Sequence, residues 1–155
     1  MRPFTQPVVL LVEDEPLARL TQVEILREAG FWVLQAQDAD EAFDPLRRRQ
    51  DVRAVLTDVD MPGSLDGFEF SRLVVQGRPE VGVLVISGNK LLDKGDLPPS
   101  GRFLAEPVRP EILGERLQSR ARCPAGAISE QNPRRSRESW RFSAPEAALA
   151  SRSVF

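Results

Sequence analysis

Five short apolar runs are spaced along the chain and have the character of buried strands. They are rich in Val, Leu, Ile and Phe and lack a regular alternation with polar residues, which is typical of strands covered on both faces of a parallel sheet. The predicted strands cover residues 8–12, 31–36, 54–58, 81–87 and 103–105.

The segments between these runs carry apolar residues at mostly helical spacing. Pro16 suits the first turn of a helix, where its missing N–H costs nothing, and Gly30 is typical of a helix end. Pro45 weakens the second helical pattern, and residues 88–101 predict at most a short helix. The predicted helices run from Pro16 to just before Gly30 and over residues 38–48, 66–76 and 110–119. In the first helix the apolar residues are Leu17, Leu20, Val23, Ile25 and Leu26.

The alternation of strands and helices predicts an α/β fold. Right-handed crossovers leave few possible topologies. We predict a flavodoxin-like, doubly wound, five-stranded parallel sheet with strand order 2-1-3-4-5 and helices on both faces.

This pattern ends after Ser119. Residues 120–143 mix Arg, Ser, Pro, Gly and Asn without a sustained period, and only residues 144–151 could form a short helix. Residues 1–119 hold 14 Lys and Arg against 20 Asp and Glu, a net charge of −6, whereas residues 120–155 hold seven Arg against three Glu, a net charge of +4. We therefore predict a folded domain over residues 1–120 and a polar, Arg-rich, disordered tail over residues 121–155.

The composition excludes several classes of function. The chain has no histidine, so a Ser-His-Asp triad, a His-ligated zinc site and a phosphohistidine intermediate are ruled out. Its single cysteine, Cys123, cannot form an internal disulfide and fits a reducing compartment. The apolar runs are too short to span a bilayer, and no secretion signal stands at the N-terminus. These features predict a cytoplasmic protein without a membrane segment.

Three acidic residues fall at the carboxyl ends of predicted strands. Glu13 and Asp14 follow the first strand, and Asp58 closes the third, its neighbour in the predicted sheet. Ligands of open parallel α/β sheets bind at this edge, and neighbouring strand ends lie about 5 Å apart. Crowded carboxylates repel one another, and oxygen-only ligation with room for water favours Mg²⁺. A single acid in such a place would usually be only solvated, but three together predict a cation site.

A hydroxyl group is expected at the same edge. Ser87 ends the fourth predicted strand, beside the third, and Gly88 should leave the space next to it open. A Ser-Gly pair after a strand is usually only a turn. Next to Asp58, the Ser87 hydroxyl becomes a candidate hydrogen-bond donor to an anion formed on that carboxylate.

Four motifs together resemble the receiver domains of bacterial two-component response regulators, over about residues 7–119. The motifs are VEDEP at residues 12–16, LTDVDMPG at 56–63, DG at 66–67 and VISG at 85–88. The resemblance implies that Asp58 is the phosphoacceptor and that Glu13 and Asp14 form the acidic pair that binds Mg²⁺ with it. It also implies that Asp60 gives a backbone carbonyl to the metal, that Ser87 is the switch hydroxyl and that Phe103 is the switch aromatic residue.

Position 106 departs from the family pattern, which places a lysine directly before the proline that Pro107 matches. That lysine would pair with the acceptor carboxylate and later with the phosphoryl oxygens. Glu106 stands there instead, and its charge is repulsive toward a phosphoryl dianion. We expect Glu106 to turn outward, to gain a proton or to contact the cation. The chain's only lysines are Lys90 and Lys94, of which Lys90 is close enough to Ser87 to be a candidate substitute.

The resemblance implies a signalling receiver rather than an enzyme with a separate substrate. Asp58 would take a phosphoryl group from a histidine kinase or a phosphotransfer protein. The new charge would draw in Ser87, change the Phe103 rotamer and shift the face formed by the fifth strand and its flanking helices. Because no DNA-binding or catalytic domain follows in this sequence, we expect output through contact with an unidentified downstream protein, or a competing drain on a kinase's phosphoryl groups.

Three other interpretations stay open on the sequence. Glu106 could mark a degenerate receiver that binds a partner without phosphorylation. The DVD motif at residues 58–60 also fits haloacid-dehalogenase-type phosphatases, although those enzymes carry it on their first strand. The basic tail could contact nucleic acid or a membrane surface. The tail residues concerned are Arg134, Arg135, Arg137, Trp140, Arg141 and Phe142.

Overall fold

The computed structural model describes residues 6–63, 65–88 and 101–121. Its strands are β1 (Val8–Val12), β2 (Trp32–Ala36), β3 (Val52–Asp58), β4 (Gly82–Ser87) and β5 (Arg102–Ala105). Its helices are α1 (Pro16–Glu28), α2 (Ala39–Arg48), α3 (Gly67–Gly77) and α4 (Pro110–Ala121). The predictions for Lys90, Lys94, Cys123, the short helix between β4 and β5 and the tail fall outside the described residues.

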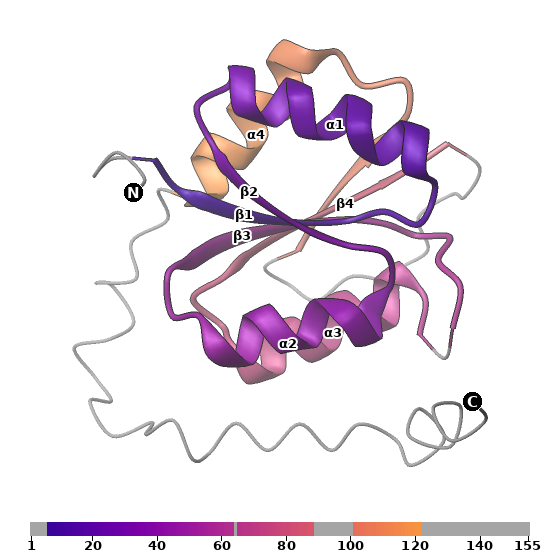
Figure 1. The fold of residues 1–155 in the computed structure, drawn as a ribbon, viewed down its shortest axis with the longest axis vertical. Coiled ribbons are helices and arrows are strands. Elements are labelled where there is room, and N and C mark those ends of the chain that lie inside the picture. Colours follow the sequence, from indigo (N-terminus) through magenta and orange to yellow (C-terminus); the bar gives the residue numbers. More distant parts are fainter. Residues whose placement is uncertain (1–5, 64, 89–100, 122–155) are drawn as a thin grey trace.

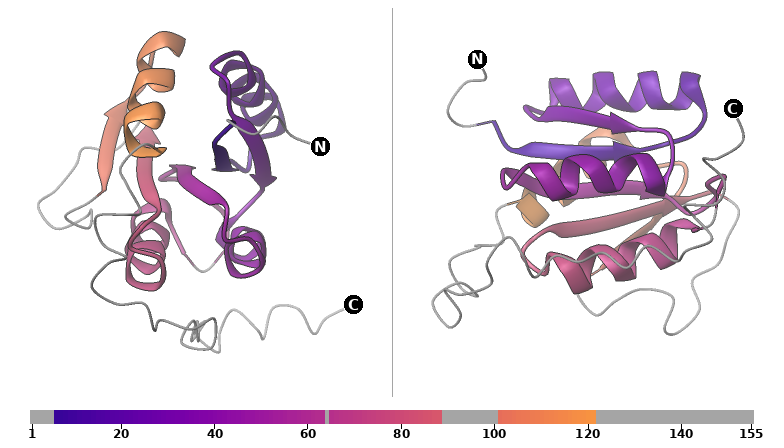
Figure 2. Two further views of the ribbon diagram at one scale, coloured as in Figure 1. Left: turned by 90° about the vertical axis from the view of Figure 1, so that its left-hand side faces the viewer. Right: turned by 60° about the horizontal axis from the view of Figure 1, so that its bottom comes forward.

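The five strands form one parallel sheet in the order β2-β1-β3-β4-β5. Helices α1 and α4 cover one face of the sheet, and α2 and α3 cover the other (Figures 1 and 2). The predicted fold class and strand order are confirmed. Because all strands run the same way, their carboxyl ends meet at one edge, where Val12 is level with Thr57 and Asp58 with Ile86.

A hydrophobic core lies on each face of the sheet. All five residues of β1 are fully buried, and alternate residues enter opposite cores. Val9 and Leu11 pack with the α1/α4 side, whereas Leu10 and Val12 pack with the α2/α3 side. Burial on both faces explains why β1 reads as an unbroken apolar run.

Helix α1 buries only part of its apolar set. Val23 and Leu26 are fully buried, but Leu17 is 70% exposed and Leu20 is 57% exposed. At 100° per residue, Leu26 lies half a turn around the helix from Leu17, so both cannot face the sheet. Helical spacing alone does not tell which apolar stripe becomes the core.

Side-chain caps fix where three helices begin, and Glu15 is the N-cap of α1. Asp38 accepts a hydrogen bond from the backbone N–H of Glu41 at 2.8 Å, and Asp66 forms a capping box with Glu69. The predicted starts at residues 38 and 66 were therefore one residue early, because these acids are N-caps. Pro45 does not end α2, which continues to Arg48.

The domain should fold without the tail. The sheet is complete at β5, and α4 closes the second core through the buried Leu113 and Leu117. A chain ended after Ala121 should keep its melting temperature within about 4 °C of the full chain, equivalent to about 1 kcal/mol. Calorimetry of both chains checks this, and a larger loss would show that the tail stabilises the domain.

Candidate functional site

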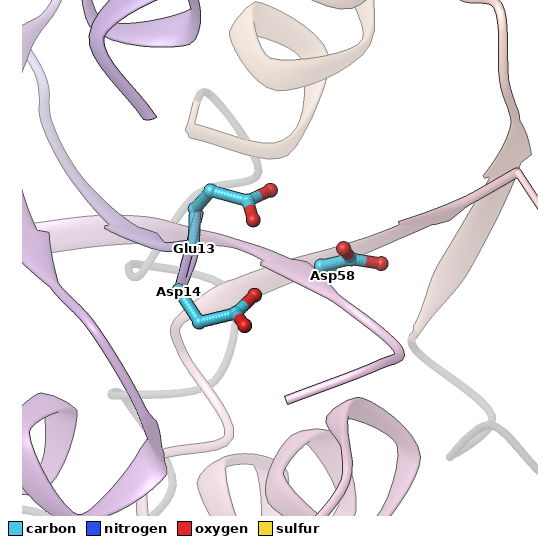
Figure 3. A group of neighbouring side chains, drawn as sticks. All are labelled: Glu13, Asp14 and Asp58. Atoms are coloured by element: carbon cyan, nitrogen blue, oxygen red, sulfur yellow. The ribbon is translucent and has the colours of Figure 1, made fainter. Parts of the chain in front are cut away.

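Three carboxylates from two neighbouring strands come together at the carboxyl edge of the sheet. Glu13 and Asp14 follow β1, Asp58 ends β3, and one oxygen of each lies within 4.8 Å of the others (Figure 3). Glu13 is buried, Asp58 is half-buried and Asp14 is exposed. The structure thus brings together the three acids that the sequence placed at this edge.

The surroundings oppose the charge on two of these groups. Burial raises the pKa of Glu13 to about 7, the backbone N–H of Glu15 opposes this shift, and the charges of Asp58 and Asp14 add to it. Burial also raises the pKa of Asp58, against hydrogen bonds from the backbone N–H groups of Val59 and Asp60. Negative charge is therefore in excess at this edge.

This donor set fits a hard divalent cation. All three side chains offer carboxylate oxygens, and a +2 charge would offset both their mutual repulsion and the cost of burying Glu13. Oxygen donors with an exposed member that leaves room for water suit Mg²⁺ better than zinc or copper.

Replacing Asp14 by alanine should abolish Mg²⁺ binding. The substitution removes the exposed carboxylate of the three and leaves Glu13 and Asp58 with too few oxygen donors. Titration followed by amide NMR shifts checks this. Asp44→Ala is the matched control, because Asp44 lies on α2 in an exposed pair with Arg48. An unchanged affinity in Asp14→Ala would defeat the assignment of Asp14 as a ligand.

The metal-free protein should be more stable near pH 6 than near pH 8. The pKa of Glu13 is about 7 in the folded state against an ordinary 4.5, so between these values the folded state holds a proton that the unfolded state has lost. Stability therefore falls as the pH rises through about 7. The absence of histidine leaves few other groups that titrate in this window.

Thermal melts in chelator check this pH dependence. Glu13→Gln should remove most of the difference, and saturating Mg²⁺ should diminish it, because the cation displaces the proton. A wild-type melting temperature that is equal or higher near pH 8 in chelator would contradict the raised Glu13 pKa.

Gly67 positions the backbone around Asp58. Its N–H donates to the carbonyl oxygen of Val59 at 2.9 Å. A Cβ at position 67 would lie 2.8 Å from both the Asp58 carbonyl carbon and the Val59 Cα, closer than real side chains come. Only glycine lets α3 begin this close to the end of β3, which gives the DG motif a physical reason.

Ser87 and Phe103 lie on the strands beyond Asp58. Ser87 is buried at the end of β4, the strand next to β3. Phe103 on β5 is half-buried, and its ring stacks on Phe68 of α3 with centroids 6.3 Å apart and an interplanar angle of 27°. The Phe103 side chain therefore packs against the core on the α2/α3 side.

Glu106 places its exposed carboxylate beside Gly88, at the carboxyl edge of the sheet. Its backbone N–H donates to the Ser87 carbonyl oxygen at 2.9 Å, which holds residue 106 level with the end of β4. Its Oε2 lies 3.0 Å from the position that a Cβ would take at Gly88. Its charge also contributes to the raised pKa of Asp58. The Glu106 carboxylate therefore occupies part of the space that Gly88 was predicted to leave open. Pro107 follows through a cis peptide bond and is exposed.

Sequence reasoning missed one residue at this edge. Arg19 of α1 donates from Nη1 to the carbonyl oxygen of Glu13 at 2.9 Å. This bond ties the first turn of α1 to the loop that carries the acidic pair. A basic residue one helical turn after the capping Glu15 was the available signal, but its partner is a backbone atom that no motif reveals.

The fold and the acidic edge define a receiver-type signalling domain, and comparison with known proteins agrees. The family model described as "Response regulator receiver domain" matches residues 9–95, more than half of the chain. The chain belongs to this family. A receiver is a signalling domain rather than a classical enzyme, and its family is phosphorylated by histidine kinases and binds Mg²⁺ at the acidic site. The DVD motif begins at the last residue of β3, the third strand, which argues against the phosphatase interpretation.

Several curated relatives are longer than this chain. The transcriptional regulatory protein AruR of Pseudomonas aeruginosa is 32% identical over 136 residues, which are 83% of this chain and 55% of AruR. The sensor protein TorS of Escherichia coli is 28% identical over 112 residues, only 12% of its length. The response regulator receiver protein CpdR of Brucella abortus is 28% identical over 102 residues, which are 64% of this chain and 83% of CpdR.

Solved structures share the fold. A response regulator receiver protein from Sinorhizobium medicae superposes with a TM-score of 0.72 at 22% identity, covering 78% of this chain and 98% of that one. The receiver domain of a sensor histidine kinase from Pseudomonas aeruginosa, solved with a magnesium ion in its active site cleft, has a TM-score of 0.64 at 27% identity. It covers 76% of this chain and 98% of its own. No helix in the described ranges is long and apolar enough to cross a membrane.

Proposed function

We propose that this chain is a cytoplasmic phosphoacceptor receiver that takes a phosphoryl group on Asp58 from a histidine kinase or a phosphotransfer protein. The observation that carries the proposal is the position of the Asp58 carboxylate, at the end of a central strand and within 4.8 Å of oxygens of Glu13 and Asp14. Output would pass through contact with a downstream protein. The receiver would comprise residues 1–120, with residues 121–155 as a tail.

The chain's own residues position the acceptor. A carboxylate oxygen of Asp58 would form a bond to phosphorus while the phosphorus–nitrogen bond of the donor's phosphohistidine breaks, and the donor imidazole leaves. Backbone N–H groups of Val59 and Asp60 orient the Asp58 carboxylate. Glu13, Asp14 and Asp58 would hold Mg²⁺ with the Asp60 carbonyl. A bound Mg²⁺ would neutralise negative charge on the phosphoryl oxygens.

Phosphorylation would reach the surface through Ser87 and Phe103. The Ser87 hydroxyl would donate to a phosphoryl oxygen on Asp58, because it lies at the end of the adjacent strand. A shift of Ser87 would change the packing of Phe103 against Phe68 and with it the surface of β5 and α4. The result is a population shift between two packings, biased by a local charge.

Glu106 favours a second candidate function. Its carboxylate lies beside Gly88 and contributes to the raised pKa of Asp58. Its negative charge would also repel a phosphoryl group on Asp58. Such a domain could bind a partner protein without a phosphorylation cycle. NMR of the full chain with Mg²⁺ separates the two functions. Addition of phosphoramidate should shift amide signals at Asp58 and Ser87 if the chain is a phosphoacceptor, and should leave them unchanged if it is only a binding module.

A further inference from the structure

We propose that Glu106 is a charge gate on the acceptor site, one that disfavours small dianionic phosphodonors and favours a protein donor bringing a Lys or Arg side chain to Glu106. This inference rests on the proposed role of Asp58 as phosphoacceptor. The partner would be a donor protein that carries a basic side chain beside its phosphoryl group.

The backbone of Glu106 is held at the edge of the sheet where a donor would approach Asp58. The N–H bond to the Ser87 carbonyl fixes residue 106 at the carboxyl edge of the sheet, and the carboxylate approaches the bare Cα of Gly88. Glu106 and Gly88 are both exposed, so a partner can reach the carboxylate directly. In the strand order, this end of β4 lies next to the end of β3, which carries Asp58.

The charges around the acceptor are mostly of one sign. Glu13 and Asp14 share the site with Asp58, and the negative charges of Glu106 and Asp60 also act on Asp58. The guanidinium of Arg19 is bonded to the backbone carbonyl of Glu13. A divalent cation at the three-carboxylate site offsets only part of this negative charge.

The charge of the phosphodonor determines how strongly Glu106 repels it. Acetyl phosphate carries two negative charges near neutral pH and no cationic group, so it meets the full repulsion of Glu106. Phosphoramidate carries one charge less and is repelled less. A protein donor can place a basic side chain against the exposed Glu106, and an ion pair there would turn the repulsive group into a docking contact.

The rates of Asp58 phosphorylation by the two small donors test the gate. Intact-mass time courses of the full chain would compare wild type, Glu106→Gln and Glu24→Gln at saturating Mg²⁺, with Mg²⁺ affinity measured for each variant. Glu24 is exposed on α1, so its substitution changes net charge equally without altering the site. Glu106→Gln should raise the acetyl phosphate rate by about threefold to tenfold and the phosphoramidate rate by less. Higher salt should narrow the wild-type difference between donors.

Two results would overturn the gate and leave the proposed function standing. If Glu106→Gln leaves the ratio of acetyl phosphate to phosphoramidate rates at the wild-type value, Glu106 does not select by charge, while phosphorylation of Asp58 still stands. If Glu24→Gln changes the ratio as much as Glu106→Gln, the effect is one of net charge rather than of this position. Absence of phosphorylation in every variant would instead remove the proposed function, and the gate with it.

Discussion

Replacing Glu106 by lysine should strengthen the coupling between phosphorylation and the β5–α4 surface. In wild type, the group that approaches the site from residue 106 is a carboxylate, which repels the phosphoryl oxygens. A lysine on the same backbone, still bonded to the Ser87 carbonyl, would attract them. A charge-assisted contact of this kind is worth about 1.5–3 kcal/mol, as large as a typical allosteric coupling of about 1–3 kcal/mol.

Amide shift changes on phosphorylation measure this coupling. They should be larger in Glu106→Lys than in wild type at Ser87, Phe103 and along α4, with Glu106→Gln intermediate. Exposed Glu111→Lys, on the first turn of α4, is a control for added positive charge. If wild type already switches as fully as Glu106→Lys, another cation performs the lysine's role, and Lys90 is the first suspect.

Replacing Arg78 by methionine should lower the free energy of unfolding by about 3–5 kcal/mol. The Arg78 side chain is only 5% exposed and donates to three backbone carbonyls, those of Leu46 at 3.0 Å, Arg49 at 2.7 Å and Gln50 at 3.2 Å. It also pairs with Glu80 at 2.9 Å. Methionine would fill much of the volume but leave these acceptors without their donor, and each buried unsatisfied group costs about 1–3 kcal/mol.

Urea denaturation with a constant slope checks the loss. Arg48→Met is the matched control, because Arg48 is 78% exposed in its pair with Asp44 and should change stability by less than about 1 kcal/mol. Arg78→Lys should recover only part of the loss, since an ammonium cannot reproduce the guanidinium fork. If Arg78→Met loses no more than Arg48→Met, the carbonyl contacts of Arg78 do not hold the end of α2 to the end of α3.

Strand β1 could be predicted from the sequence, whereas the contacts of Arg78 could not. Val8–Val12 predicted a buried parallel strand because each of its residues enters a core, so local composition and final environment coincide. Arg78 lies between Gly77 and Pro79 and reads as a turn. Its partners are backbone carbonyls 28 to 32 residues away, which only the folded chain brings to it.

Some features of the candidate site could likewise be predicted from the sequence, and others could not. Glu13, Asp14 and Asp58 could be placed together because parallel strands end at one edge, and strand order alone brings their oxygens within reach. The direction of the Glu106 side chain could not be predicted, because it depends on the approach to Gly88 and on the Ser87 carbonyl. The exposure of Leu17 likewise depends on how α1 is rotated against the sheet.

The proposed function is tested most directly by whether Asp58 becomes phosphorylated. The full chain would be incubated with phosphoramidate and Mg²⁺ and its intact mass measured, beside Asp58→Asn and a sample in chelator. We expect a gain of about 80 Da, the mass of one phosphoryl group, in wild type with Mg²⁺ and in neither of the other samples. A wild-type mass that stays unchanged, or a gain that persists in Asp58→Asn, would contradict the assignment of Asp58 as the phosphoacceptor.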